Sequence, residues 1–394
     1  MENSYGKKPV IMQILPALES GGVERGVVDI AKALEKDGFR PIVVSKGGVL
    51  VYQLREAGIS HIQLPVHSKN PLTIYFNNKK ISKLLQEHCV DIVHVRSRAP
   101  MWSAYFACKN LQVKMVATVH GTYSLNFLKW KVFTPKRLYN ALMLKADEII
   151  AVSGFIKDYI IKNYQEIHLA SLAEKITIIQ RGADLGYFNC AKVSKSRMID
   201  LSKKWHLPED KKIILMPARF TSWKGHDFLI DALLKVKNDF FCVMVGSDHG
   251  HKIFRKKIEN RIVESGLAGK VQIFGLCKDM PAAYAVSHFV VCPSVRPEAF
   301  GRIAIEAQAS NRIIIATKIG GSLETIIDEK TGFLVDVNDS DKFAELIDRA
   351  LDMSKERADE MGNAGRKNIE ENFSNEKMCG ETIKIYKEIL KRII

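Results

Sequence analysis

The chain has 394 residues, 46% of them hydrophobic and 26% charged, which is enough for about two globular domains. A formal net charge of +15 favours anionic partners, a class that includes nucleic acid, anionic membrane surfaces and phosphorylated substrates. Seven cysteines without any C-x-x-C pair argue against a disulfide framework and against a zinc site, and they favour a reducing cytoplasm. The sequence contains no run of about 18 apolar residues, so no membrane-spanning helix is predicted.

Short apolar runs alternate with amphipathic stretches along the first half of the chain. Strands are expected at 10–15, 41–44, 62–64, 91–95, 114–118, 148–152 and 176–179. Helices are expected between most of them, including 23–35, 79–86 and 155–163. Strands that alternate with helices predict a parallel sheet with both faces covered.

The pattern pauses around residues 182–195, with 186–196 as the linker candidate, and then restarts as a second unit. Its strands are expected at 213–217, 241–245, 271–274, 289–292, 313–316 and 333–335, with a helix at 227–236. We therefore predict an α/β protein with domains at 1–190 and 191–374. Open parallel sheets bind ligands at the carboxyl ends of their strands, so two such edges are expected to face each other across a crevice. Residues 375–394 form an amphipathic helix that must cover another surface.

Several common signatures are absent from the sequence. It contains no G-x-G-x-x-G after the first strand, no P-loop, no H-E-x-x-H and no G-x-S-x-G. Its one D-x-D element, Asp339-Ser340-Asp341, precedes a predicted helix, and this position favours capping of backbone N–H groups over metal binding.

Charged residues follow two strands of the second domain. Arg219 and Lys224 come after the strand at 213–217, where a guanidinium and an ammonium suit phosphate oxygens. Glu298 and Glu306 flank the start of a helix after the strand at 289–292, and carboxylates accept hydrogen bonds from paired sugar hydroxyls. Each group alone also fits a plain alternative, a solvated basic loop or an acidic helix cap, but the two together favour a ligand site.

Two elements of the first domain are weaker candidates. Gly21-Gly22, between the first strand and first helix, suits close approach of backbone N–H groups to an anion, or a simple tight turn. His120 ends a strand and faces either the crevice or the core.

Taken in chain order, these elements resemble the family 4 glycosyltransferases of the GT-B fold, over nearly the whole chain. The segments that carry the resemblance are Gly21-Gly22, His120-Gly121, Arg181-Gly182-Ala183-Asp184, Arg219-x4-Lys224, Glu298-x7-Glu306 and Thr331-Gly332-Phe333-Leu334-Val335. The resemblance implies two Rossmann-like domains facing across a cleft, with the helix at 375–394 crossing back to the first. It differs at Arg181, where the family usually has Asn, and this puts the usual donor contact of that loop in doubt.

The resemblance also implies roles for single residues. Arg219, Lys224 and Glu298 would be the catalytic group, with the two cations on the donor diphosphate and Glu298 on hydroxyls of the transferred sugar. Glu306 would hold the ribose. The remaining donor contacts would be Gly21, Gly22, His120 and the backbone N–H groups of Phe300 and Gly301.

The implied reaction is transfer of a hexose from UDP or GDP with retained anomeric configuration. No carboxylate is nominated for a double displacement, so we expect front-face attack in which the leaving phosphate takes the acceptor proton. No metal or other cofactor is expected, because Arg219 and Lys224 supply the positive charge.

The acceptor is expected to be a glycan or glycolipid, held by Arg96, Arg98 and Tyr123. The segment 296–302 is similar to that of bacterial lipopolysaccharide-core transferases, including mannosyltransferases, and predicts a role in core or other cell-envelope glycan synthesis. Aromatic and basic residues at 127–137 suit an anionic lipid surface, or a loop packed on the core. We expect a cytoplasmic protein that contacts the cytoplasmic face of the inner membrane peripherally.

Two other functions share some of these features. Nucleotide-sugar 2-epimerases have the same two-domain architecture and need no acceptor. A non-catalytic nucleic-acid binder would explain the charge, but the aromatic residues form no stacking platform and no known motif is present.

Overall fold

The computed structural model describes residues 8–19, 21–122, 135–164, 172–248 and 250–392. The chain divides into two compact units, one of residues 1–181 with 375–394, the other of residues 182–374. The division thus lies between Arg181 and Gly182, whereas the sequence placed it after residue 190. In the described part of the chain, no helix has the length and apolar character needed to cross a bilayer.

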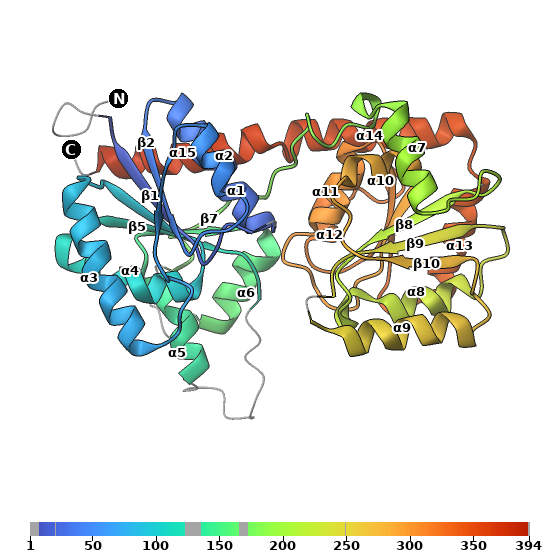
Figure 1. Ribbon diagram of the computed structural model, residues 1–394, viewed down its shortest axis with the longest axis horizontal. Helices are drawn as coiled ribbons and strands as arrows, with labels where there is room; N and C mark the ends of the chain where they lie inside the picture. Colours follow the sequence, from blue (N-terminus) through green and yellow to red (C-terminus); the bar gives the residue numbers. More distant parts are fainter. Residues whose placement is uncertain (1–7, 20, 123–134, 165–171, 249, 393–394) are drawn as a thin grey trace. The chain divides into compact units, whose positions relative to one another are not determined.

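The first unit is built on a parallel seven-stranded sheet with the order β3-β2-β1-β4-β5-β6-β7. Its strands are β1 (Val10–Ile14), β2 (Arg40–Ser45), β3 (Ser60–Gln63), β4 (Ile92–Val95), β5 (Lys114–Val119), β6 (Glu148–Ala151) and β7 (Ile176–Ile178). Its helices are α1 (Gly22–Lys36), α2 (Val51–Glu56), α3 (Pro71–Glu87), α4 (Arg98–Leu111), α5 (Pro135–Ala141), α6 (Gly154–Tyr164) and α15 (Asn375–Lys391). The parallel sheet predicted for this half of the chain is confirmed (Figure 1).

Helix α15 belongs to the first unit although it ends the chain. Its buried residues Ile383, Tyr386 and Ile389 share a core cluster with Ile30 and Leu34 of α1. Outside that cluster, Asn375 donates to Asp29 and Lys387 pairs with Asp37 at 2.7 Å. The amphipathic pattern of residues 375–394 therefore covers the first sheet and α1, as the predicted crossing back requires (Figure 1).

The second unit contains a parallel six-stranded sheet with the order β10-β9-β8-β11-β12-β13. Its strands are β8 (Ile213–Pro217), β9 (Phe241–Val245), β10 (Val271–Phe274), β11 (Phe289–Cys292), β12 (Ile313–Thr317) and β13 (Phe333–Val335). Its helices are α7 (Lys195–Lys204), α8 (His226–Leu233), α9 (Lys252–Glu264), α10 (Met280–Val286), α11 (Arg302–Ala309), α12 (Ser322–Thr325), α13 (Ser340–Asp352) and α14 (Lys355–Asn372).

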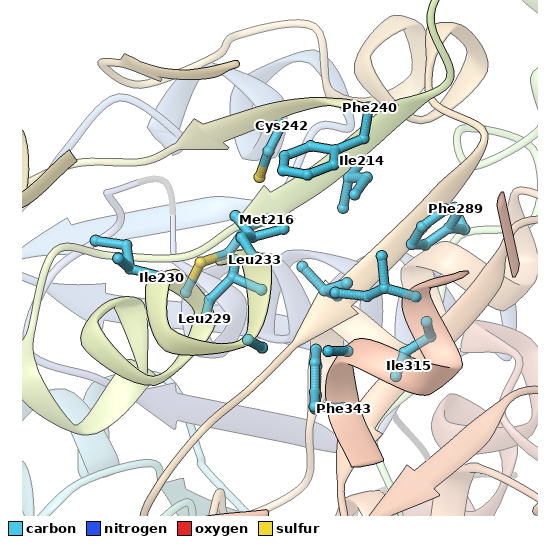
Figure 2. Packing of buried hydrophobic residues seen from close by; sticks show 14 of the residues in the cluster. Ile214, Met216, Leu229, Ile230, Leu233, Phe240, Cys242, Phe289, Ile315 and Phe343 are labelled. Carbon is cyan, nitrogen blue, oxygen red and sulfur yellow. The ribbon is translucent and has the colours of Figure 1, made fainter. Parts of the chain in front are cut away.

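Apolar side chains on one face of this sheet form the main core of the second unit. Figure 2 shows Ile214, Met216 and Ile315 of the sheet packed with Leu229 of α8 and Phe343 of α13. These strands are buried along almost their whole length, as expected for a parallel sheet covered by helices. Helix α13 begins at the D-x-D element, where the Asp339 carboxylate accepts from the Lys342 backbone N–H at 2.9 Å, so the predicted cap is confirmed.

Candidate functional site

The strand order of the second unit reverses between β8 and β11. The chain builds β8, β9 and β10 outward and then returns to place β11 beside β8. In open parallel sheets, ligands bind at the carboxyl ends of two strands where the strand order reverses in this way. Arg219 and Lys224 follow β8, and Glu298 follows β11, so the fold brings the predicted basic and acidic loops to one place.

Lys224 and Glu298 form a direct ion pair at this end of the sheet. The Lys224 Nζ lies 2.6 Å from the Glu298 Oε1, and the two side chains are only 8% and 11% exposed. The Ser294 hydroxyl donates to the same Oε1 at 2.6 Å. The ammonium and the carboxylate are thereby held in one fixed geometry before any ligand binds.

The charge on Glu298 is maintained against burial. Burial by itself raises the pKa of this carboxyl, but the Lys224 ammonium and the hydrogen bonds from Lys224, Ser294 and Cys292 outweigh it and leave the pKa below its usual value. Burial and the nearby Glu298 raise the pKa of the Cys292 thiol to about 12, so the thiol stays protonated and can donate to the carboxylate. Glu298 is an ionised hydrogen-bond acceptor throughout the neutral range.

Arg219 is exposed, in contrast to Lys224. Both cations contact Trp223, whose ring centroid lies 5.9 Å from the Arg219 guanidinium carbon and 4.5 Å from the Lys224 Nζ. The indole orients both cations by cation–π attraction and leaves the guanidinium accessible to an anion.

Glu306 lies on α11 and is also pre-oriented. Its Oε1 pairs with Arg302 at 2.6 Å and its Oε2 accepts from the Tyr284 hydroxyl at 3.2 Å. Burial and the Glu306 charge raise the pKa of Tyr284 well above its usual value, so this phenol remains a donor. A carboxylate has about four acceptor positions, and two of them are used here.

Phe300 and Gly301 shape the turn that starts α11. Gly301 has φ +83° and is the residue before the helix, while Phe300 is buried against Phe373. The turn packs against the loop after β12, where the Gly321 N–H donates to the Glu298 carbonyl oxygen at 2.9 Å. A Cβ on Gly321 would lie 2.2 Å from the Phe300 carbonyl oxygen, so glycine is required at this contact.

The first unit has the same reversal, between β1 and β4. Gly21 is the N-cap of α1 and Gly22 its first residue, so the predicted glycine turn stands at a helix N-terminus that favours anions. The Arg181 guanidinium, which replaces the family's usual Asn, donates to the Gly22 carbonyl oxygen. Its function in this structure is to hold the turn.

Arg96 is buried, at 3% exposure, and lies inside the first unit. Its Nη2 donates to Gln13 Oε1 at 2.6 Å and its Nη1 to Thr118 Oγ1 at 3.3 Å. These bonds tie the end of β4 to β1 and β5. The contact of Arg96 with an acceptor stays a prediction.

His120 and Arg98 lie near this network. Burial, Arg181 and Arg96 lower the pKa of His120 well below its usual value, so the imidazole is neutral. Arg98 is half-buried, and its Nη1 donates to Asn140 Oδ1 at 2.9 Å. Tyr123 and residues 127–134 lie outside the described part of the chain.

Sequence reasoning missed the neutral residues that support the charged ones. In the second unit these are Trp223, Tyr284, Cys292 and Ser294. In the first unit His94 bonds Thr118 at 2.7 Å and the hydroxyl of Tyr386 on α15. Among these, Trp223 had an available signal, since it stands inside the selected basic loop, and Ser294 lies just before the selected segment that carries Glu298.

Two family models match the chain and together cover most of it. Residues 20–187 match Glycosyltransferase Family 4, and residues 198–368 match Glycosyl transferases group 1. The first match ends six residues beyond the division between the two structural units, and the second match lies wholly within the second unit.

Known proteins are similar over 70% to 98% of the chain. A glycosyltransferase crystal structure from Rickettsia africae is 41% identical and has a TM-score of 0.87, with 98% of this chain and 99% of that chain covered. HepE from Anabaena, solved with UDP and glucose, is 20% identical with a TM-score of 0.80, over 96% of this chain and 99% of that one. The capsular polysaccharide biosynthesis glycosyltransferase CapM of Staphylococcus aureus is 28% identical over 70% of each chain.

Proposed function

Because the chain belongs to the GT-B glycosyltransferases with a family 4 and a group 1 domain, we propose that it transfers a hexose from a nucleotide-diphosphate donor with retention. The observation that carries this proposal is the cluster of Arg219, Lys224 and Glu298 where β8 and β11 diverge. It combines an accessible guanidinium, a fixed ammonium and an ionised carboxylate, which match a diphosphate beside a sugar. The UDP complexes of HepE support a UDP-linked donor.

The reaction builds negative charge on the diphosphate as the glycosidic bond breaks. The exposed Arg219 meets this charge directly, and the Lys224 ammonium has N–H groups left after its bond to Glu298. Cations held in place before the reaction stabilise the transition state without reorganising. We propose front-face attack, in which the leaving phosphate takes the acceptor proton.

The carboxylates position the donor by accepting hydrogen bonds from hydroxyl groups. Glu298 is proposed to hold hydroxyls of the sugar, assisted by the N–H groups of Phe300 and Gly301. Glu306 is proposed to use its free acceptor positions on the ribose. In the first unit, the Gly21-Gly22 turn at the start of α1 suits a phosphate, and the neutral His120 suits a sugar hydroxyl.

Metal independence is part of the proposal, because Arg219 and Lys224 provide the charge that a divalent cation would otherwise supply. We expect activity to survive excess EDTA. Loss of turnover in EDTA that Mg²⁺ restores would contradict this.

For the acceptor we propose a glycan or glycolipid of the cell envelope, with the lipopolysaccharide core as the specific candidate. CapM supports the broader class, since its name places it in capsular polysaccharide synthesis. Of the two arginines predicted for an anionic acceptor, Arg96 is buried and Arg98 is half-buried. Transfer of radiolabelled hexose to a lipid A precursor bearing inner-core sugar tests the specific candidate, and transfer only to other glycans would exclude it.

We further propose peripheral contact with an anionic membrane through one face of α3. Helical spacing places three exposed apolar residues and three lysines on that face: Leu72, Tyr75, Phe76, Lys79, Lys80 and Lys83. Leu72 is 68% exposed and Phe76 57%. Sedimentation with phosphatidylglycerol vesicles should fall in Leu72→Ser/Phe76→Ser and persist in Ile253→Ser, an exposed control on α9. Equal sedimentation of both variants would contradict this contact.

The donor site is tested by thermal shift and turnover. The ligands compared are UDP, GDP and ADP and their sugar conjugates. We expect only the nucleotide that the site binds, with its sugar conjugate, to raise the melting temperature, because a ligand that binds only the folded state stabilises it. Arg219→Ala and Glu306→Ala should abolish the shift and the turnover. Arg349→Ala is the matched control, because it removes an exposed guanidinium on α13 that pairs with Glu329. It should change neither the thermal shift nor the turnover. An epimerised sugar formed from donor alone would contradict transferase activity.

A further inference from the structure

A cavity lies at the amino ends of the strands of the second sheet, opposite the end that carries Arg219, Lys224 and Glu298. It has a volume of about 1160 Å³ and is lined by residues directly before β8, β11 and β12, which are Lys212, His288 and Arg312. In a parallel sheet these residues all stand at the amino ends of the strands. Small-molecule sites typically have about 300–1,000 Å³, so this cavity has room for a ligand with an extended apolar part.

The cavity has apolar walls from three helices. Met198 and Ile199 come from α7, Val286 from α10, and Met353 from the end of α13. Helices α7 and α10 pack against each other beside the sheet (Figure 1). Ile199 is 51% exposed, so the wall continues to the surface as an accessible apolar lip.

The floor of the cavity carries two cations whose bonding partners are neutral. The Lys212 ammonium donates to the Leu351 and Met353 carbonyl oxygens. The Arg312 guanidinium donates to the Tyr284 and Ala285 carbonyl oxygens at 2.8 and 3.0 Å. Within the described ranges no carboxylate forms an ion pair with either cation.

His288 lies between them and adds a third donor. Its Nδ1 accepts from the Ile213 N–H at 2.8 Å, which places the proton of the neutral ring on Nε2. Burial and the positive charges of Lys212 and Arg312 lower the pKa of His288. This is the direction expected when no nearby anion offsets those charges. The lining also includes Lys203 and Lys355, whose two positive charges are equal in number to the negative charges of Glu209 and Asp359. The cavity is therefore positive at its floor and apolar along its walls.

We propose that this cavity binds an anionic amphiphile, an apolar chain that carries one phosphate or carboxylate group. The anion occupies the floor, where Lys212, His288 and Arg312 supply donors, and the chain lies along Met198, Ile199 and Met353. Apolar walls alone would accept any hydrophobic ligand, and the cations alone would accept any small anion. Their combination selects a molecule that has both parts.

Isothermal titration of the full chain tests this with four probes below their critical micelle concentrations. Oleoyl lysophosphatidic acid and oleate carry the anion and the chain, monooleoylglycerol carries the chain alone, and glycerol phosphate carries the anion alone. We expect at least one of the two anionic amphiphiles to bind at one site. The amphiphile that binds more tightly shows whether the site prefers a phosphate or a carboxylate head group. Binding by monooleoylglycerol and glycerol phosphate should be at least about tenfold weaker.

Ile199→Asp places a carboxylate on the exposed lip and should weaken binding at least about tenfold, because it repels the anion and removes apolar wall. Leu234→Asp is the matched control, since Leu234 is 49% exposed at the end of α8 and does not line the cavity. Both variants change exposed positions, so their melting temperatures should match the wild type. The proposal is overturned if neither anionic probe binds, if monooleoylglycerol binds equally well, or if Ile199→Asp leaves the affinity unchanged.

Discussion

The Lys224–Glu298 ion pair couples the stability of the second unit to its chemistry. The two groups lie 2.6 Å apart and are almost fully enclosed. Removing water from two charges is costly, and their attraction compensates only while both partners remain. Loss of one partner leaves an unpaired charge in a low-dielectric site.

We therefore predict that Glu298→Gln lowers the free energy of unfolding by about 3–5 kcal/mol, because the Lys224 ammonium remains buried without its counter-ion. The double variant Lys224→Met/Glu298→Gln should regain much of that loss and still be inactive. Urea denaturation and turnover measure the two effects separately. If the double variant is no more stable than Glu298→Gln, the pair does not carry the stability assigned to it.

His226 makes stability depend on pH next to the same loop. It is completely buried, stacked on Phe220 at 4.7 Å, and burial lowers its pKa to about 4. The unfolded chain binds a proton below about pH 6.5 while the folded ring stays neutral. Stability is therefore fully present above pH 6.5 and is lost as the pH falls towards 4, by on the order of 3 kcal/mol.

The variant His226→Phe should remove this contribution and keep the aromatic packing. We expect its free energy of unfolding to fall less than that of the wild type between pH 6.5 and 4.5. Parallel curves for the two proteins would show that His226 does not titrate on unfolding.

At the residue scale, the sequence was sufficient to select the charged groups but not to pair them. Arg219, Lys224 and Glu298 were identified because each follows an apolar strand. The contact between Lys224 and Glu298 joins residues 74 positions apart, and it depends on β11 lying beside β8, which the sequence pattern does not specify. The burial of Arg96 was not predictable for a related reason, because it depends on Gln13 and Thr118 from neighbouring strands.

At the scale of elements, the loops after the strands fit together through glycine contacts. Gly225 ends the turn that carries Lys224 with φ +78°, and a Cβ there would lie 1.8 Å from the Pro293 carbonyl oxygen. This contact joins the loop after β8 to the loop after β11. It fixes the spacing between the loop that carries Lys224 and the loop that carries Glu298.

Gly225→Ala should lower stability by about 2 kcal/mol more than Gly266→Ala, and it alone should lower donor affinity. Gly266 is a suitable control because its φ is +71°, but a Cβ on it would have no atom of the described residues within 4 Å. Both variants incur the cost of a left-handed alanine, so the difference reports the contact with Pro293. Thermal melts and nucleotide titration measure it, and equal losses would argue against the contact.

Elements with clear periodicity were predictable, while those shaped by tertiary packing were not. The helix at 23–35 corresponds closely to α1, whose apolar residues lie on one face. Helix α4 was not predicted, because its sequence contains Pro100 near the start and buries residues around much of its surface. The expected helix at 79–86 is the end of α3, whose first turns present exposed Leu72 and Phe76 and so lack the usual amphipathic pattern.

At the scale of the whole molecule, the first unit is built from two segments that are far apart in the sequence, residues 1–181 and 375–394. The first unit is completed by α15, whose Ile383 and Tyr386 pack into its core, while the main core of the second unit, as far as the chain is described, contains no residue from that helix. The Tyr386 hydroxyl also bonds the buried His94. The first unit is therefore incomplete until α15 has been made.

We predict that a chain ending at residue 374 loses the first unit's melting transition and keeps that of the second. Truncation would expose the faces of α1 and the sheet that α15 covers, and each large side chain uncovered costs about 1.5–3 kcal/mol. Scanning calorimetry resolves the two transitions, and the thermal shift with UDP reports whether the second unit still binds. Tyr386→Phe is the graded control, because it removes one buried hydrogen bond. It should lower the free energy of unfolding of the first unit alone, by about 1–3 kcal/mol. If truncation lowered both transitions equally, α15 would stabilise the two units together and the assignment of the helix to the first core would be wrong.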